Sequence, residues 1–232
     1  AVLLPELQEK LEQVRATEWN RFPRGLKHLD VVAGENGVSF APPFAEFDTR
    51  ELMLTIRGEV YNYNAEAFFQ INPSLLGPLI DFALGDASGE TVLDLYCGVG
   101  LFTLPLSRRF KKVIGVEANS SAARFARRNL QRAGLTNARV ITATVTDWFR
   151  SDGTGPVDLI LLDPPRAGAE SAVIKGILDL GPAEISYVSC DPATLARDLK
   201  KLVGSYTITS IRGFDLFPQT HHVETVVRLR KQ

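Results

Sequence analysis

Short apolar runs alternate with helix-forming stretches along most of the chain. The expected strands cover residues 91–96, 112–117, 139–143, 157–162, 185–189, 206–214 and 223–230, and helices are expected near 74–84, 101–110, 120–134, 169–180 and 192–203. Such alternation is typical of right-handed crossovers that build a parallel sheet covered by helices. No helix separates the last two strands, so we expect them to form an antiparallel hairpin. We therefore expect an α/β fold with a Rossmann-like, mostly parallel sheet.

The first 65 residues follow a different pattern. Apolar residues recur at helical spacing near the start, namely Leu4, Leu7, Leu11 and Val14. Two short apolar runs, 29–33 and 37–40, then flank a turn that begins at Gly34, and residues 51–63 alternate around Gly58. The sequence predicts a helix with a small antiparallel sheet over residues 1–65 and a separate α/β domain over residues 66–232.

The composition of the chain bears on which molecules it could bind. Apolar residues make up 45% of the 232 residues and the formal net charge is −1, so the chain as a whole has no basic signal for nucleic acid. Two local clusters of Lys and Arg, at 108–112 and 124–132, are interpreted either as solvated helix faces or as patches that hold phosphates. Nothing in the composition favours one oligomeric state.

Cysteine usage and the absence of long apolar runs bear on the cellular compartment. The 2 cysteines are too few for a disulfide framework or a cysteine-based metal centre, which favours a reducing cytoplasm. No apolar run reaches the ~20 residues of a membrane span and no signal segment opens the chain, so no membrane partner is expected. Because the chain begins at Ala1 and its only methionine is Met53, we expect it to be part of a longer protein.

A glycine-bearing loop follows the first strand of the α/β region. Gly98 and Gly100 allow a tight turn and a close approach to a ligand, and Asp94 ends the preceding strand. A dinucleotide fingerprint would place a third glycine at position 103, which is Thr103. Glu117 ends the next strand at the distance expected for an acid that binds a ribose. The pattern favours S-adenosylmethionine over a dinucleotide; the alternative is a tight turn in a domain that binds no cofactor.

Two further motifs follow later strands. Cys190 stands between a strand and a helix, where the helix amides favour the thiolate. Asp163 and Arg166 flank two prolines after another apolar run. Because open parallel sheets bind ligands at the carboxyl ends of their strands, we expect Asp163 and Cys190 on the same edge as the glycine loop. The alternatives are an inert, buried cysteine and an aspartate that only caps a turn.

Five motifs in order resemble the RNA uracil-C5 methyltransferases, which make 5-methyluridine in tRNA and rRNA. They are Phe68-Phe69-Gln70-Ile71-Asn72, Asp94-Leu95-Tyr96-Cys97-Gly98-Val99-Gly100, Asp163-Pro164-Pro165-Arg166-Ala167-Gly168, Ser189-Cys190-Asp191-Pro192-Ala193-Thr194 and His222-Val223-Glu224-Thr225. The resemblance covers roughly residues 60–232. It implies a class I S-adenosylmethionine-dependent methyltransferase fold, S-adenosylmethionine as cofactor and an RNA substrate, either tRNA or rRNA.

The resemblance also implies roles for individual residues. Cys190 corresponds to the nucleophile and Glu224 to the general base. The implied cofactor-binding residues are Gln70, Asp94, Tyr96, Gly98, Gly100, Glu117 and Asp163. The implied substrate-binding residues are Phe68, Gln70, Asp163 and Arg166. Phe69 and Tyr63 are either further stacking surfaces for a base or core residues.

The expected reaction is methylation of uridine C5 through a covalent adduct between Cys190 and C6. A thiol has a pKa of about 8.5, so Cys190 needs activation, which we expect from the helix that begins near Pro192 and from Arg197. Glu224 is expected to remove the C5 proton; the alternative is an ion pair with Arg228 or Arg230. Competing functions are a cytosine-C5 RNA methyltransferase, a non-catalytic RNA-binding module with a methyltransferase fold, and a small-molecule methyltransferase.

Overall fold

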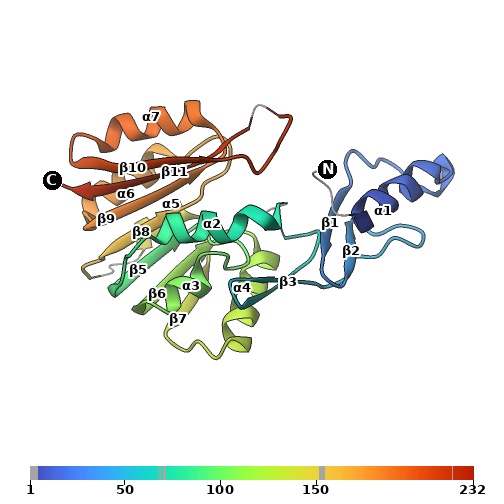
Figure 1. The fold of residues 1–232 in the computed structure, drawn as a ribbon, viewed down its shortest axis with the longest axis horizontal. Helices are drawn as coiled ribbons and strands as arrows, with labels where there is room; N and C mark the ends of the chain where they lie inside the picture. Colours follow the sequence, from blue (N-terminus) through green and yellow to red (C-terminus); the bar gives the residue numbers. More distant parts are fainter. Residues whose placement is uncertain (1–4, 68, 70–71, 152–154, 221) are drawn as a thin grey trace.

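The computed structural model describes residues 5–67, 69, 72–151, 155–220 and 222–232. Its largest element is a seven-stranded sheet with the strand order β10-β11-β9-β8-β5-β6-β7. The strands are β5 (Gly89–Leu95), β6 (Phe110–Glu117), β7 (Ala138–Thr142), β8 (Leu159–Leu162), β9 (Glu184–Ser189), β10 (Tyr206–Phe214) and β11 (Glu224–Lys231). All seven predicted strands are present, which confirms the α/β fold (Figure 1).

The C-terminal strands form the predicted hairpin. β11 pairs antiparallel with both β10 and β9, whereas β5, β6, β7, β8 and β9 pair in parallel. β11 therefore lies between β9 and β10 and is the strand that runs against the others. Consequently its first residue lies at the same edge of the sheet as the last residues of the parallel strands.

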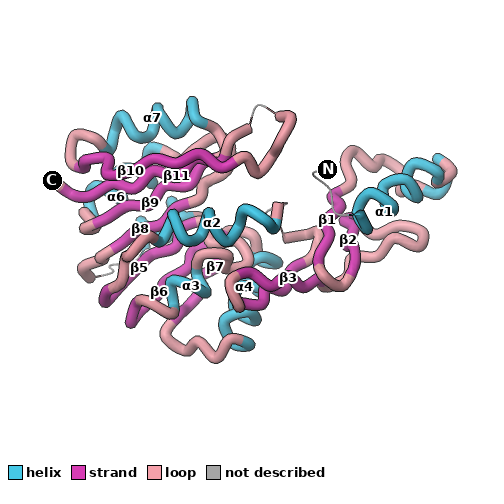
Figure 2. Tube along the Cα trace, viewed as in Figure 1, coloured by secondary structure: helices cyan, strands magenta, loops and turns pink. Residues whose placement is uncertain are grey.

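Helices cover both faces of the sheet (Figure 2). One hydrophobic core joins the sheet to α2 (Pro73–Leu84), α3 (Thr103–Ser107) and α4 (Ser120–Arg132), and a second core joins it to α5 (Val145–Ser151), α6 (Ser171–Leu180) and α7 (Pro192–Leu202). Adjacent strand residues such as Val92 and Leu93 face opposite cores, as the alternation of a β-strand requires. The two-faced burial explains why a central strand such as β8 is apolar throughout, whereas the edge strand β10 is largely exposed and contains polar residues.

Some helix boundaries differ from the prediction. Helix α5 was not predicted, because its 7 residues, about two turns around the buried Trp148, are too few to show periodicity. The helix expected over 101–110 is limited to α3. Asn72, not Ser74, is the N-cap residue of α2, and the Ser74 hydroxyl donates to the Asn72 side chain at 2.7 Å.

The N-terminal region contains two separate hairpins rather than the single small sheet that was predicted. Its elements are α1 (Pro5–Ala16), the 3₁₀ turn η1 (Trp19–Arg21), β1 (Asp30–Gly34) paired with β2 (Gly37–Ala41), and β3 (Leu52–Ile56) paired with β4 (Glu59–Tyr63). A small core built largely of aromatic side chains, including Phe40, Phe44 and Phe47, joins α1 to the first hairpin.

The second hairpin packs with the α/β unit. Leu52, Leu54 and Tyr61 belong to the same core as α2 and α4. Glu51, just before β3, accepts hydrogen bonds from Arg128 at 2.6 Å and from Arg132 at 3.2 Å on α4. Part of the region before residue 65 is therefore buried against the region after it. The division of the chain into two domains at residue 65 stays a prediction.

The predicted basic clusters contain several ion pairs within the chain. Besides the contacts of Arg128 and Arg132 to Glu51, Arg108 pairs with Glu59 at 2.8 Å and Lys111 with Glu90 at 2.6 Å. Exposed pairs of this kind contribute little stability individually. They favour the solvated-face interpretation of both clusters. Within the described ranges, no helix is long and apolar enough to span a bilayer.

Candidate active site

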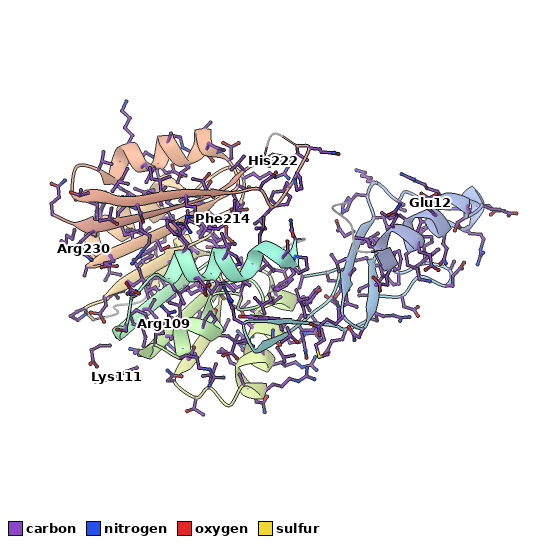
Figure 3. All side chains as sticks on the ribbon, viewed as in Figure 1. Glu12, Arg109, Lys111, Phe214, His222 and Arg230 are labelled. Carbon is purple, nitrogen blue, oxygen red and sulfur yellow. The ribbon has the colours of Figure 1, made fainter. Side chains whose placement is uncertain are left out.

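The structure places the predicted site residues at one edge of the large sheet. Asp94 and Glu117 lie at the carboxyl ends of β5 and β6, and Asp163 and Cys190 directly follow β8 and β9. Glu224 opens the antiparallel β11, where the pairing of Thr225 with Ser189 puts it beside the Cys190 turn. Figure 3 shows His222, just before β11, at this end of the sheet, and Arg230 at the other end. The five positions therefore converge although up to 130 residues separate them along the sequence.

The glycine loop reverses the chain after β5. Tyr96 has a φ of +64°, a left-handed conformation that is uncommon outside glycine, and it is half-buried. Gly98 has a φ of +55°, and a Cβ added to it would meet no atom within 4 Å. The Gly100 N–H donates to the Cys97 carbonyl at 2.9 Å and closes the turn. The loop thus leaves open space at Gly98 with a backbone that favours glycine.

The Glu117 carboxylate fixes this loop to the next strand. One oxygen accepts from the Gly98 N–H at 2.9 Å and the other from the Asn119 N–H at 2.7 Å. Asn119 in turn caps α4 by accepting from the Ala122 N–H at 3.0 Å. A carboxylate offers about four lone-pair positions, so Glu117 keeps acceptor capacity for the hydroxyls of a ligand.

Asp94 is fully buried beneath the loop. The Thr103 hydroxyl donates to its Oδ2 at 2.5 Å, while Oδ1 has no partner among the residues described. Burial raises the pKa of Asp94 to about 7, a rise that the Thr103 hydrogen bond partly offsets. Thr103 therefore holds Asp94 beneath the loop. The glycine pattern of a dinucleotide site gave no indication of this role for position 103.

Asn129 on α4 joins the β3–β4 hairpin to the glycine loop. Its Nδ2 donates to the carbonyls of Asn62 at 3.1 Å and Val99 at 3.0 Å, and its Oδ1 accepts from the Asn62 N–H at 2.9 Å. The Tyr61 hydroxyl also reaches the loop, donating to the Leu101 carbonyl at 3.1 Å. No local pattern indicated these contacts, because they join residues that are far apart in the sequence.

We expect Asn129→Leu to lower the free energy of unfolding by about 3 kcal/mol or more. Three backbone groups would lose their partners while buried, and each such loss costs roughly 1–3 kcal/mol. Gln131→Leu changes an exposed amide on the same helix and serves as the control. Urea unfolding of both variants tests the expectation, and equal stability of the two would contradict it.

Cys190 is half-buried, and its surroundings differ from the prediction. Burial, Glu224 and Asp163 raise the pKa of the thiol, and Arg166 lowers it in part. The amides of the following helix are occupied, because the Asp191 Oδ1 accepts from Ala193 N at 2.8 Å and Thr194 N at 2.9 Å. The prediction that helix amides activate the thiol is therefore wrong.

Arg197 does not serve the thiol either. It donates to the buried carboxylate of Asp198 at 2.9 Å and to the Ala167 carbonyl at 2.9 Å. The expectation that Arg197 activates Cys190 is wrong because this guanidinium balances another carboxylate. The cation that acts on the thiol is the exposed Arg166.

Glu224 is 1% exposed, and its Oε1 has no hydrogen-bond partner within the described part of the chain. Burial raises its pKa to about 7. The alternative of an ion pair is excluded, since Arg228 and Arg230 both contact Glu184, at 3.3 Å and 2.9 Å. Glu224 is thus a buried carboxyl poised to exchange a proton near neutral pH.

Asp163 belongs to the same electrostatic cluster. Burial of its carboxyl, together with the nearby Glu224 and Asp94, raises the pKa of Asp163 well above its usual value. Like charges so close together resist full ionisation of the cluster.

The aromatic candidates for base stacking divide into two groups. Phe68 and Gln70, both predicted to meet the substrate, lie outside the described residues. Phe69 and Tyr63 are buried and stack on each other with ring centroids 4.4 Å apart, and the Tyr63 hydroxyl donates to the Ala33 carbonyl at 2.6 Å. These two rings are core residues.

Cys97 is separate from the reactive cluster. It is 5% exposed, and its Sγ lies so close to Gly115 that a Cβ there would come within 2.9 Å of it. Burial raises the pKa of the Cys97 thiol well above its usual value. A group of His, Cys, Asp and Glu suited to a metal ion is absent from the described ranges.

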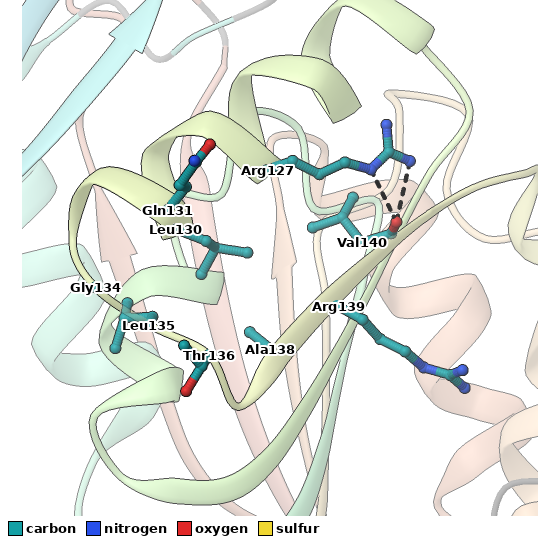
Figure 4. A pocket seen from close by; sticks show the side chains of 9 residues that line it. All are labelled: Arg127, Leu130, Gln131, Gly134, Leu135, Thr136, Ala138, Arg139 and Val140. Carbon is teal, nitrogen blue, oxygen red and sulfur yellow. Dashed lines mark hydrogen bonds between the residues drawn. The ribbon is translucent and has the colours of Figure 1, made fainter.

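A pocket of about 430 Å³ lies elsewhere, between α4 and the amino-terminal half of β7 (Figure 4). Arg127 lines it and donates to the Val140 carbonyl at 3.1 Å and 3.0 Å. Because the pocket adjoins the start of β7, it lies away from the carboxyl edge that carries Cys190. It is not part of the candidate active site.

A comparison with a protein-family model shows to which family this chain belongs. The model described as tRNA (uracil-5-)-methyltransferase matches residues 44–150 and 155–232. The chain belongs to the tRNA (uracil-5-)-methyltransferase family. The membership confirms the resemblance drawn from the five motifs.

RNA methyltransferases from bacteria match most of the chain. An uncharacterized RNA methyltransferase of Thermotoga maritima is 38% identical over 216 residues, covering 91% of this chain and 49% of that protein. One from Streptococcus pyogenes is 34% identical over 236 residues, covering 96% and 50%. The chain spans about half the length of these curated relatives.

Solved structures agree with the fold. The tRNA (uracil-54, C5)-methyltransferase of Pyrococcus abyssi, in complex with S-adenosyl-L-homocysteine, is 32% identical with a TM-score of 0.71, over 80% of this chain and 46% of that one. The tRNA m1G37 methyltransferase of M. jannaschii has a TM-score of 0.63 at 16% identity, over 84% of this chain and 60% of that one, and it shows the fold alone. The class I methyltransferase fold is confirmed.

The raised pKa of Glu224 predicts a pH dependence of stability in this family member. The folded state keeps a proton that the unfolded state releases, so stability falls as the pH rises from 4.5 to about 7. We expect Glu224→Gln to reduce this fall by about 2–3 kcal/mol, given 1.36 kcal/mol per pKa unit. Urea unfolding at about pH 5 and about pH 8 measures it. Glu184→Gln is the control, and an unchanged pH dependence in Glu224→Gln would contradict the prediction.

Proposed function

We propose that this chain is the catalytic part of an enzyme that methylates uridine at C5 in RNA, with S-adenosylmethionine as methyl donor and a covalent Cys190 adduct as intermediate. The observation that carries the proposal is the pairing of β9 with β11. It sets the half-buried residue Cys190 beside the buried Glu224, whose Oε1 has no partner among the described residues, at the edge that carries the glycine loop. An RNA substrate also agrees with the family and with the relatives.

The residues around the glycine loop fit S-adenosylmethionine. Gly98 leaves open space, the buried Asp94 Oδ1 lacks a partner among the described residues, and Glu117 keeps acceptor capacity. We infer that these three, with Gly100, Tyr96, Asp163 and Gln70, hold the cofactor. When bound, S-adenosylmethionine supplies an electrophilic methyl group and leaves as a neutral thioether. The Pyrococcus abyssi relative, described in complex with S-adenosyl-L-homocysteine, supports the same choice.

Cys190 has to make C5 of uracil nucleophilic. Its thiolate forms a bond to C6, and the electrons of the C5=C6 bond move onto the ring carbonyl to give an enolate. C5 of this enolate can accept a methyl group. Because burial and two carboxyls raise the pKa of the thiol, the nearby Arg166 is the group that favours the thiolate. Phe68, Gln70, Asp163 and Arg166 are proposed to bind the target base.

Glu224 completes the cycle as a base. Once C5 is methylated, its proton moves to the Glu224 carboxylate, the C5=C6 bond reforms, and the bond from C6 to Sγ breaks to release Cys190. A pKa of about 7 suits proton transfer at neutral pH. A cytoplasmic location, proposed from the two cysteines, would keep the Cys190 thiol reduced.

The proposal is tested by methyl transfer to RNA. The protein is incubated with methyl-labelled S-adenosylmethionine and with unmodified tRNA or rRNA transcripts, and the RNA is digested to nucleosides. We expect the label in 5-methyluridine, and fragment mapping identifies the RNA class and the nucleotide. Label in 5-methylcytidine, or no label in any RNA, would overturn the proposal.

A further inference from the structure

Asp198 on α7 is a buried carboxylate that the reaction outlined above does not use. It is fully buried, and it accepts hydrogen bonds from Ala169 N at 2.9 Å, from the Tyr187 hydroxyl at 2.8 Å and from Arg197 at 2.9 Å. A buried charge is tolerated only when it is paired and hydrogen-bonded, as here. One of its donors is a backbone group of the segment that follows β8.

Two other side chains of α7 hold the same segment. Arg197 donates to the Ala167 carbonyl at 2.9 Å. The Thr194 hydroxyl shares its one proton between the Arg166 carbonyl at 3.2 Å and the Asp191 carbonyl at 3.1 Å, so it bridges the two segments. Together with the contact of Asp198 to Ala169, they attach α7 to the backbone of residues 166–169 at three points. We name Thr194, Arg197 and Asp198 the α7 clamp.

Gly168 shows how closely the clamp approaches this backbone. It has a φ of +78°, and a Cβ added to it would lie 2.6 Å from Asp198 Oδ2 and 2.5 Å from Arg197 Nη2. Both the left-handed backbone and the lack of space favour glycine here. These contacts restrict the backbone of residues 166–169 against α7, and they thereby restrict the position of Arg166.

The same helix also fixes the nucleophile. α7 begins at Pro192, and its N-cap Asp191 directly follows Cys190 and holds the turn by accepting from Ala193 N and Thr194 N. Thr194 thus touches both sides of the site: its backbone belongs to the Cys190 turn, and its hydroxyl holds Arg166. One rigid element sets the spacing between the thiol and the cation.

We propose that Thr194, Arg197 and Asp198 are positioning residues that fix the Arg166 backbone so that its guanidinium acts on the Cys190 thiol. This inference rests on the proposed function, in which Cys190 is the nucleophile. The charged groups that act on the thiol are Glu224 from β11 and Asp163 and Arg166 from the clamped segment. Asp191 lies in the thiol's own turn, and its pKa is lowered by hydrogen bonds from the Thr194 and Ala193 amides and, to a smaller extent, by His222. Arg166 is the cation of this set that opposes the carboxyls, so its placement governs thiolate formation.

The test measures alkylation of Cys190 by iodoacetamide at fixed neutral pH, followed by mass spectrometry of the peptide that contains Cys190. Neither RNA nor cofactor is present, so the result does not depend on methyl transfer. Thr194→Val removes the hydroxyl at a half-buried position and keeps the shape of the side chain, whereas Thr194→Ser keeps the hydroxyl. Melting curves verify that each variant is folded.

We expect Thr194→Val to slow alkylation about 3- to 10-fold, since displacing a nearby cation raises a thiol pKa by roughly 0.5–1 unit. Thr194→Ser should react nearly as fast as the original protein. In an Arg166→Gln background, which is already slow, Thr194→Val should cause no further loss, because the hydroxyl acts through Arg166. An unchanged rate in Thr194→Val, or an equal loss with and without Arg166, would overturn the inference.

Discussion

Cys190→Ala is expected to abolish methyl transfer and to abolish covalent capture of RNA that carries 5-fluorouridine at the target position. Fluorine at C5 leaves no proton for Glu224 to remove, so the adduct of the original protein should persist. The complex should then survive denaturing electrophoresis as a shifted band. Alanine has no sulfur to bond to C6, and the loss should therefore be complete within detection.

The site of attachment distinguishes the two cysteines. Digestion of the captured complex should give RNA on the peptide that contains Cys190 and none on the peptide that contains Cys97. Cys97 is 5% exposed and packs against Gly115, so it cannot reach a base. A normal shifted band from Cys190→Ala would contradict the covalent mechanism, whatever the methyl transfer activity of the original protein.

Glu224→Gln is expected to lower turnover by about 10²–10⁴-fold, the usual contribution of a positioned general base. Glutamine has a similar size and fills the same buried site, but it cannot take the C5 proton. Adduct formation and the first methyl transfer should continue, while release of Cys190 should stall. A burst of methylated, protein-bound RNA with ordinary uridine, followed by slow turnover, is the expected time course.

Glu184→Gln is the matched control for this variant. Glu184 opens β9 at the opposite edge of the sheet, where it contacts Arg228 and Arg230, and it belongs to no part of the proposed reaction. It should change turnover little. If Glu224→Gln turned over as fast as Glu184→Gln, another group would have to be the base. If Glu224→Gln formed no adduct at all, Glu224 would be needed before methyl transfer.

The acidic cluster connects activity with stability. Asp94, Asp163 and Glu224 each have a raised pKa because they are buried, which costs stability when they ionise. The same burial brings the pKa of Glu224 close to neutral pH, where a base accepts and releases a proton most effectively. We therefore expect Glu224→Gln to be less active than the original protein and, between about pH 4.5 and 7, to have a stability that depends less on pH.

The sequence determined the architecture of the α/β unit and pointed to the groups that we propose to be reactive. Apolar runs at regular spacing predicted all seven strands of the sheet and the C-terminal hairpin, because a strand covered on both faces must be apolar along its length. The positions of Asp163 and Cys190 after apolar runs predicted that they would lie on the edge that carries the glycine loop, since the ends of parallel strands share an edge. The place of Glu224 beside them depends on the antiparallel pairing of β11 with β9.

Only the tertiary structure decided which groups act on the thiol. In the sequence, the α7 amides and Arg197 are the positive groups that follow Cys190 most closely. In the structure, Asp191 accepts hydrogen bonds from two of these amides and Asp198 accepts from Arg197. The cation that remains is Arg166, from a segment 24 residues earlier. Likewise, Arg228 and Arg230 contact Glu184 on another strand, and the Glu224 Oε1 has no partner in the part of the chain that the structure describes. Pairing of charges depends on burial and on contacts between distant segments, and a local pattern of residues contains neither.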